Sequence, residues 1–117
     1  MPLVDVTCSE AVSEQVRRAV ADALPHLVSL AVKCPAEPYD GELQAGDVVV
    51  RFRDVGPIDR FDLDVLVEIG SKWDEYRARD RNGRAERVRA GVQELVGSGL
   101  LVGVYLRLPV AGWAQSP

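Results

Sequence analysis

The chain has 117 residues, of which 47% are hydrophobic and 27% are charged, and its formal net charge is −4. This size and composition predict one globular domain, residues 1–117, with a hydrophobic core. No stretch is apolar over enough residues to span a bilayer, and the first residues lack the basic and apolar regions of a signal peptide. We therefore expect a cytoplasmic protein that does not bind membranes. The acidic net charge also argues against nucleic acid as a partner.

The residues that commonly bind metals are scarce in this chain. It contains two cysteines, Cys8 and Cys34, and a single histidine, His26. Two cysteines make no disulfide framework and show no metal-ligand spacing, and one histidine excludes a histidine-rich site. We expect both cysteines to be reduced and to fill space near the ends of elements, and we expect no metal.

The first third of the chain predicts a strand followed by a helix. Residues 2–8 (PLVDVTC) are mostly apolar, and Ser9 or Ser13 can cap the helix that follows. Pro25 cannot donate a backbone hydrogen bond, so it predicts a kink or a break near Leu24. The helix carries one apolar stripe at spacings of three and four, formed by Val12, Val16, Ala19, Val20, Ala23 and Leu27.

The rest of the chain predicts strand, strand, helix and strand. Residues 34–47 read as a turn-rich loop and residues 47–55 as the second strand. The third strand, 61–69, carries an apolar residue at every second position and so presents one apolar face, formed by Phe61, Leu63, Val65, Val67 and Ile69. A helix over 82–96 and a strand over 100–108 complete the order. The residues predicted to face inward from the helix are Ala85, Val88, Val92, Leu95 and Val96.

This order predicts an α+β fold made of two consecutive β-α-β units. Placed side by side, the units form a four-stranded sheet with both helices on one face. Leu66, Leu101 and Tyr105 would then lie on the opposite face of the sheet. Apolar residues on that face need cover, which predicts an oligomer.

The stretch 72–89 holds seven of the 14 basic residues and only four acids. Such a stretch is commonly a solvated loop and helix face. It could also form a rim that attracts anions.

Four segments resemble the tautomerase superfamily: MPLVDVTCS at the start, RRAVADALPHLVSLA in the first helix, VVVRFRDV in the second strand and DVLVEIG in the third. Within it the chain looks most like the 5-carboxymethyl-2-hydroxymuconate isomerase group. The resemblance extends to Gly70 and is looser beyond it. It implies a homotrimer built as a barrel of three sheets, with an active site near each N-terminal proline. It also implies cofactor-independent isomerisation in aromatic catabolism, in which a proton moves on an unsaturated 2-hydroxy or 2-oxo (di)carboxylate such as a hydroxymuconate derivative.

Pro2 is the candidate general base. When Met1 is removed, its nitrogen becomes a secondary amine, and a base must be unprotonated at the working pH. Apolar surroundings and nearby cations both disfavour an ammonium ion. The alternative is that Pro2 only marks the start of a strand, where proline is tolerated.

Arg51 and Arg53 are the candidate anchors for a substrate carboxylate. They lie two apart in a strand and therefore project from one face. Two guanidinium groups side by side suit a dicarboxylate. The alternative is that they pair with Asp54, Asp62 or Asp64 on neighbouring strands.

Relatives usually carry an arginine just after the third-strand glycine. Here Lys72 is the nearest cation, which makes it a further candidate for substrate binding, and Arg77 is the nearest arginine. A lysine supplies charge without the bidentate fork. The insertion 71–82 could form a lid with Trp73 and Tyr76, or a mobile surface loop.

Three other functions stay open at this stage. A haloacrylate dehalogenase or hydratase would need a water-activating carboxylate in the C-terminal part of the chain, where no acid follows Glu94, and would need His26 in its site. A non-catalytic trimeric binding protein could share the fold. A nucleic-acid binder would use residues 77–89.

Overall fold

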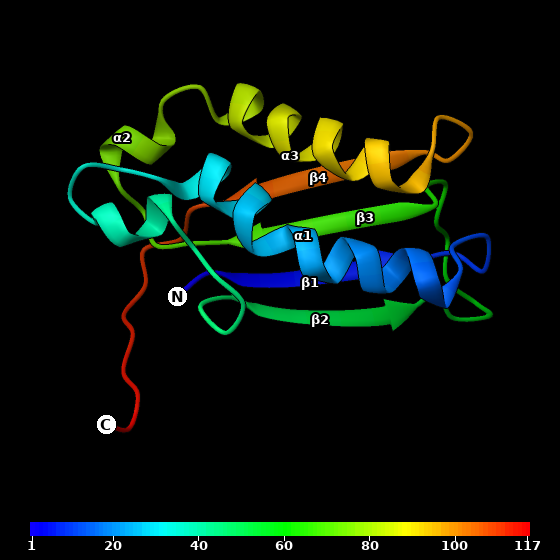
Figure 1. Ribbon diagram of the computed structural model, residues 1–117, viewed down its shortest axis with the longest axis horizontal. Coiled ribbons are helices and arrows are strands. Elements are labelled where there is room, and N and C mark those ends of the chain that lie inside the picture. The colour runs from blue at the N-terminus through cyan, green and yellow to red at the C-terminus, as the bar shows by residue number, and fades with distance from the viewer.

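The computed structural model describes residues 1–117 and contains one sheet and two long helices (Figure 1). The long helices are α1, Glu14–Val32, and α3, Arg81–Val96. A 3-10 helix, η1, spans Pro38–Gly41, and a single helical turn, α2, spans Glu75–Ala78. The strands are β1 Leu3–Cys8, β2 Val49–Asp54, β3 Val65–Gly70 and β4 Val102–Arg107.

The sheet has the strand order β2-β1-β3-β4. Strand β2 is parallel to β1, β4 is parallel to β3, and the two pairs meet through antiparallel pairing of β1 with β3. The chain therefore folds as two β-α-β units side by side. The predicted α+β class and the four-stranded sheet are confirmed.

Both long helices cover the same face of the sheet (Figure 1). Alternate residues of the central strands point into the core beneath them, because side chains in a strand alternate between its two faces. The strand residues of the core are Val4, Val6, Cys8, Val65, Val67 and Ile69; the helices add Val20, Leu24, Val28, Ala31, Val32, Val88 and Val92. No helix of the chain combines the length and the hydropathy that crossing a membrane requires. Cys8 and Cys34 are free and buried, as expected.

Helix α1 begins where one of the two predicted caps lies. The Ser13 side chain accepts a hydrogen bond from the amide of Val16 at 3.2 Å. Of the kink or break expected near Leu24, the break is wrong, since the helix runs through Pro25 to Val32. Proline inside a helix costs about 3 kcal/mol. Here the helix is held on both sides of Pro25 by buried residues of its core-facing stripe: Val20, Leu24, Val28 and Val32.

Strand β3 is shorter than predicted, because it starts at Val65 and leaves Phe61 and Leu63 outside. Its partner explains the difference. Val65 pairs with Cys8, the last residue of β1, and only one further backbone bond, from the amide of Ser9 to the carbonyl of Asp64 at 2.8 Å, continues the pairing on that side. The side chain of Asp64 accepts a hydrogen bond from the amide of Leu101 at 2.9 Å at the same end of the strand.

Helix α3 agrees with the predicted range and with most of the residues predicted to face inward. Val88 and Val92 are buried and Val96 packs against the core, whereas Leu95 is exposed. Arg84 is also buried, which the sequence analysis did not predict.

The other face of the sheet carries no helix. The register places Arg51, Asp5, Glu68 and Tyr105 in one row across it. Leu101 and Tyr105 are 61% and 59% exposed, and Leu3 is 45% exposed. The predicted uncovered face with apolar residues is thus present in the single chain.

Candidate functional site

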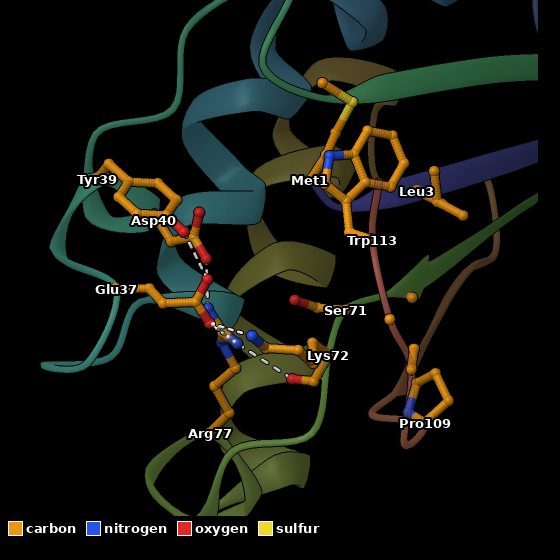
Figure 2. Close-up of a pocket in the computed structure, with 13 residues that line it drawn as sticks. Met1, Leu3, Glu37, Tyr39, Asp40, Ser71, Lys72, Arg77, Pro109 and Trp113 are labelled. Atoms are coloured by element: carbon orange, nitrogen blue, oxygen red, sulfur yellow. Dashed lines mark hydrogen bonds and ion pairs between the residues drawn. The ribbon is translucent and has the colours of Figure 1, made fainter. Parts of the chain in front are cut away.

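A pocket of about 420 Å³ lies at the edge of the sheet where β1 begins and β3 ends (Figure 2). The topology explains why several segments meet here. Because β1 and β2 run opposite to β3 and β4, this edge collects the chain's start, the loop that enters β2, the segment after β3 and the tail after β4. The lining residues are Met1, Leu3, Glu37, Tyr39, Asp40, Gly70, Ser71, Lys72, Arg77, Pro109, Ala111, Gly112 and Trp113.

Pro2 lies next to this pocket. It is buried, and its carbonyl accepts a hydrogen bond from the amide of Val49 at 3.1 Å. Its two chain neighbours, Met1 and Leu3, both line the pocket. Figure 2 shows the side chain of Met1 beside the indole of Trp113. With Met1 attached, the nitrogen of Pro2 is an amide and has no basic lone pair.

One wall of the pocket is polar and almost charge-balanced. Arg77 donates to Glu37 at 3.1 Å and to Asp40, and Lys72 lies 3.6 Å from the same Glu37 carboxylate. The hydroxyl of Tyr39 donates to Glu37 at 2.6 Å. Lys72 is half exposed, so its ammonium is the cation that can meet a ligand.

The pKa values of the two carboxylates in this wall, Glu37 and Asp40, are shifted in opposite directions. The hydrogen bond from Tyr39 lowers the pKa of Glu37, and the attraction of Arg77 and Lys72 adds to this. The same bond raises the pKa of the Tyr39 hydroxyl. Burial raises the pKa of Asp40, and the charges of Arg77, Lys72 and the N-terminal amine oppose that rise. Asp40 therefore lies within electrostatic reach of the N-terminus.

The opposite wall is apolar and comes mostly from the C-terminal tail. Leu3, Pro109, Ala111 and Trp113 form it. The carbonyl of Pro109 accepts a hydrogen bond from the amide of Trp73 at 2.9 Å, which fixes the start of the tail. A second hollow of about 270 Å³ shares four residues with the pocket: Met1, Tyr39, Asp40 and Trp113.

Arg51 and Arg53 do not line this pocket. They lie on the uncovered face of the sheet, 3.3 and 3.7 Å from the same Asp5 oxygen, which accepts no hydrogen bond. Their side chains are 67% and 66% exposed. The carboxylates proposed as alternative partners are not used, because strand β1 lies beside β2 and Asp54 pairs with Arg17.

The insertion 71–82 is built around buried arginine rather than around an aromatic lid. Asp74 caps α2 by accepting from the amides of Tyr76 and Arg77. The ring of Tyr76 lies beneath the guanidinium of Arg84, 5.4 Å from its centre. Neither Trp73 nor Tyr76 lines the pocket.

Three residues of the pocket were not predicted from the sequence: the acids Glu37 and Asp40, and the aromatic Trp113. A signal for the acids was present. A strand parallel to β1 must begin beside the start of β1, so the loop that enters it has to pass the N-terminus. No comparable signal placed Trp113.

The structure contains no group of three or more His, Cys, Asp or Glu side chains that could hold a metal ion. His26 is exposed on α1 and does not line the pocket.

The sequence matches no protein-family model and no curated protein. Solved structures do resemble the fold. A malonate semialdehyde decarboxylase gives a TM-score of 0.63 at 16% identity, over 98% of this chain and 91% of that one. A member of the cis-3-chloroacrylic acid dehalogenase family, N1, gives 0.60 at 20% identity, over 92% and 75%. A fused 4-OT symmetric trimer gives 0.60 at 14% identity, over 92% and 85%.

Identities this low establish the fold alone. The chain shares the fold of these solved structures, and both the tautomerase superfamily and the particular isomerase group remain predictions.

Proposed function

We propose that the protein is a cofactor-independent tautomerase or isomerase that moves a proton on a small unsaturated 2-hydroxy or 2-oxo acid. The observation that carries the proposal is the pocket at the N-terminus, which is flanked by both neighbours of buried Pro2 and holds a half-exposed cation, Lys72. Removal of Met1 would turn the Pro2 nitrogen into a secondary amine at this pocket. It would act as the general base that takes the proton from one position and returns it at another.

Lys72 would bind a carboxylate of the substrate, while the apolar wall around Trp113 would contact its unsaturated carbons. A cation beside the substrate's oxygen would also stabilise the negative charge that develops when the proton leaves. Arg51 and Arg53 would serve as further anion anchors across a subunit boundary.

We further propose a homotrimer, since the sheet face that bears both arginines is uncovered in the single chain and a solved structure of the same fold is a symmetric trimer. Light scattering after size exclusion should give three times the chain mass of 12.8 kDa. A monomer in solution would contradict it. We keep a cytoplasmic location as a prediction.

The activity is tested by ketonisation of a simple enol, phenylenolpyruvate or 2-hydroxymuconate. Intact mass must first show that Met1 is absent, because an acylated proline cannot act as a base. Turnover by the processed protein and a large loss in Pro2→Ala would support the proposal. No turnover by processed protein would favour a binding protein on this fold.

A second candidate activity is hydration or dehalogenation of an unsaturated acid, and the two acids of the pocket favour it. Asp40 and Glu37 lie at the N-terminal pocket, which supplies the carboxylate that the C-terminal part of the chain lacks. A carboxylate there could activate water for addition to the substrate's double bond. Halide release from 3-chloroacrylate that is lost in Asp40→Asn, but not in Glu94→Gln at an exposed position of α3, would favour this activity over isomerisation.

A further inference from the structure

Arg77 is the most deeply placed charge near the pocket, with only 1% of its side chain exposed. Its guanidinium joins three separate segments, and Figure 2 shows its bonds to two of them, at Lys72 and at Glu37 and Asp40. The Nε donates to the carbonyl of Val32 at the end of α1, at 2.5 Å. One terminal nitrogen donates to the carbonyl of Lys72 and to Glu37, both at 3.1 Å, and the other donates to Asp40.

These bonds leave Arg77 unable to act as a substrate anchor. Four of its five N–H groups already have partners, and its burial leaves no free fork facing the pocket. Its partners, in contrast, are all groups of the pocket or of the helix end behind it. Any effect of Arg77 on the reaction must pass through those partners.

The charges around the N-terminus show what that effect is. The titratable groups that surround Met1 in the two hollows are Glu37, Tyr39, Asp40, Asp47, Lys72 and Arg77. The carboxylates among them would favour the ammonium form of a nearby amine, because opposite charges attract. Arg77 bonds both Glu37 and Asp40 directly, so its one positive charge offsets about half of their combined charge, and Lys72, 3.6 Å from Glu37, offsets the rest.

We propose that Arg77 is a positioning residue that keeps the Pro2 nitrogen a free base: together with Lys72 it offsets the charges of Glu37 and Asp40, and it fixes both carboxylates and the backbone of Lys72 at the pocket. The inference rests on the proposed function, in which Pro2 is the base. It gives the insertion 71–82 a chemical role, because the insertion delivers the arginine.

The test is an NMR titration of the Pro2 nitrogen in protein labelled with ¹⁵N-proline and freed of Met1 by methionine aminopeptidase. In Arg77→Met the titration midpoint should rise by about one pH unit. Arg79→Met removes an exposed arginine from the same segment and should leave the midpoint unchanged. Adding Glu37→Gln and Asp40→Asn to Arg77→Met should bring the midpoint back down, which lost packing alone cannot do.

Folding of each variant is checked by circular dichroism. If Arg77→Met does not fold, Glu37→Gln/Asp40→Asn with Arg77 intact tests the same balance, and its midpoint should fall below that of the wild type. An unchanged midpoint in either folded variant would overturn the inference. The titration does not depend on turnover. An inactive wild type would therefore refute the proposed function, whereas the titration midpoints would still show whether Arg77 controls the protonation of Pro2.

Discussion

Replacing Arg84 should reveal how much the end of α1 depends on a charge supplied from outside the helix. Helix α1 has no basic residue in its last turn, although a helix ends with carbonyls that lack partners and with a negative dipole. Arg84 donates to the carbonyls of Ala31 at 2.6 Å and Lys33 at 3.1 Å. It makes two longer bonds, at 3.3 Å, to the carbonyls of Tyr76 and Arg79.

The expected cost of Arg84→Met follows from these bonds. Hydrogen bonds from a charged donor contribute about 1.5–3 kcal/mol each, and the two at 3.3 Å are weak. Arg84 is only 6% exposed as a residue, so its removal also removes the desolvation cost of its guanidinium, which offsets part of the loss. We therefore expect the free energy of unfolding to fall by about 3 kcal/mol. Arg84→Lys should lose about half as much, because one ammonium cannot reach all these carbonyls.

Urea unfolding followed by circular dichroism measures this difference, with all variants at one protein concentration because oligomerisation would couple stability to concentration. The control is Arg87→Met on the same helix, where the side chain is half exposed and lies 3.5 Å from Asp80. The control should change stability by less than about 0.5 kcal/mol. If Arg84→Met changed stability as little as the control, water would be able to hydrogen-bond the last carbonyls of α1 in place of Arg84, and the reasoning would be refuted.

Three further predictions concern pH, backbone and binding. Because the hydrogen bond from Tyr39 lowers the pKa of Glu37 below its ordinary value of 4.5, the stability it contributes is present above pH 4.5 and lost as the pH falls through the lowered value. Glu37→Gln should thus lower the free energy of unfolding in urea by about 1 kcal/mol at pH 7, and by progressively less below pH 4.5. An equal loss at neutral and at acid pH would contradict this. Gly97 has a φ of +95°, so Gly97→Ala should destabilise by about 1 kcal/mol in the same assay, whereas Gly99→Ala should be neutral. Lys72→Met should raise KM for a carboxylate substrate about tenfold and lower kcat by a smaller factor, because Lys72 would both bind the carboxylate and stabilise the charge that develops; steady-state kinetics would show this, and an unchanged KM would contradict it.

The sequence was informative about the core and much less so about the site. Periodicity located all four strands and both long helices, because burial on one face imposes a regular spacing. It failed where long-range partners decide the outcome. Strand β3 begins beside the last residue of β1. Pro25 remains inside α1, because helix residues before and after it are buried in the core.

The site was only partly predictable, because most of its residues come from irregular segments. Pro2 and Lys72 were selected from the resemblance, and the structure brings Lys72 to the pocket beside Pro2. Arg51 and Arg53 were also selected, but a single chain leaves them on the uncovered sheet face. The charge-rich stretch 72–89 contains two buried arginines, Arg77 and Arg84, that could not be predicted from the sequence. Most of their partners are backbone carbonyls, which every residue has and which therefore give no sequence signal.

The C-terminal tail contributes to the pocket but not to the buried core, and this leads to a last prediction. The tail adds Ala111, Gly112 and Trp113 to the pocket, yet no residue after Pro109 is buried, and the indole of Trp113 bonds only to Gln115. Ending the chain after Pro109 keeps the carbonyl that bonds Trp73 and removes the aromatic part of the apolar wall. Unfolding free energy should therefore change by less than about 1 kcal/mol, because no buried side chain is lost. KM for an aromatic enol should rise severalfold, whereas KM for 2-hydroxymuconate should change less. Trp113→Ala in the full chain should reproduce the effect on KM, and Val110→Ala should not. A truncated protein that lost several kcal/mol instead would show that the tail belongs to the core or to a subunit interface, and that the pocket and the folded frame are not independent.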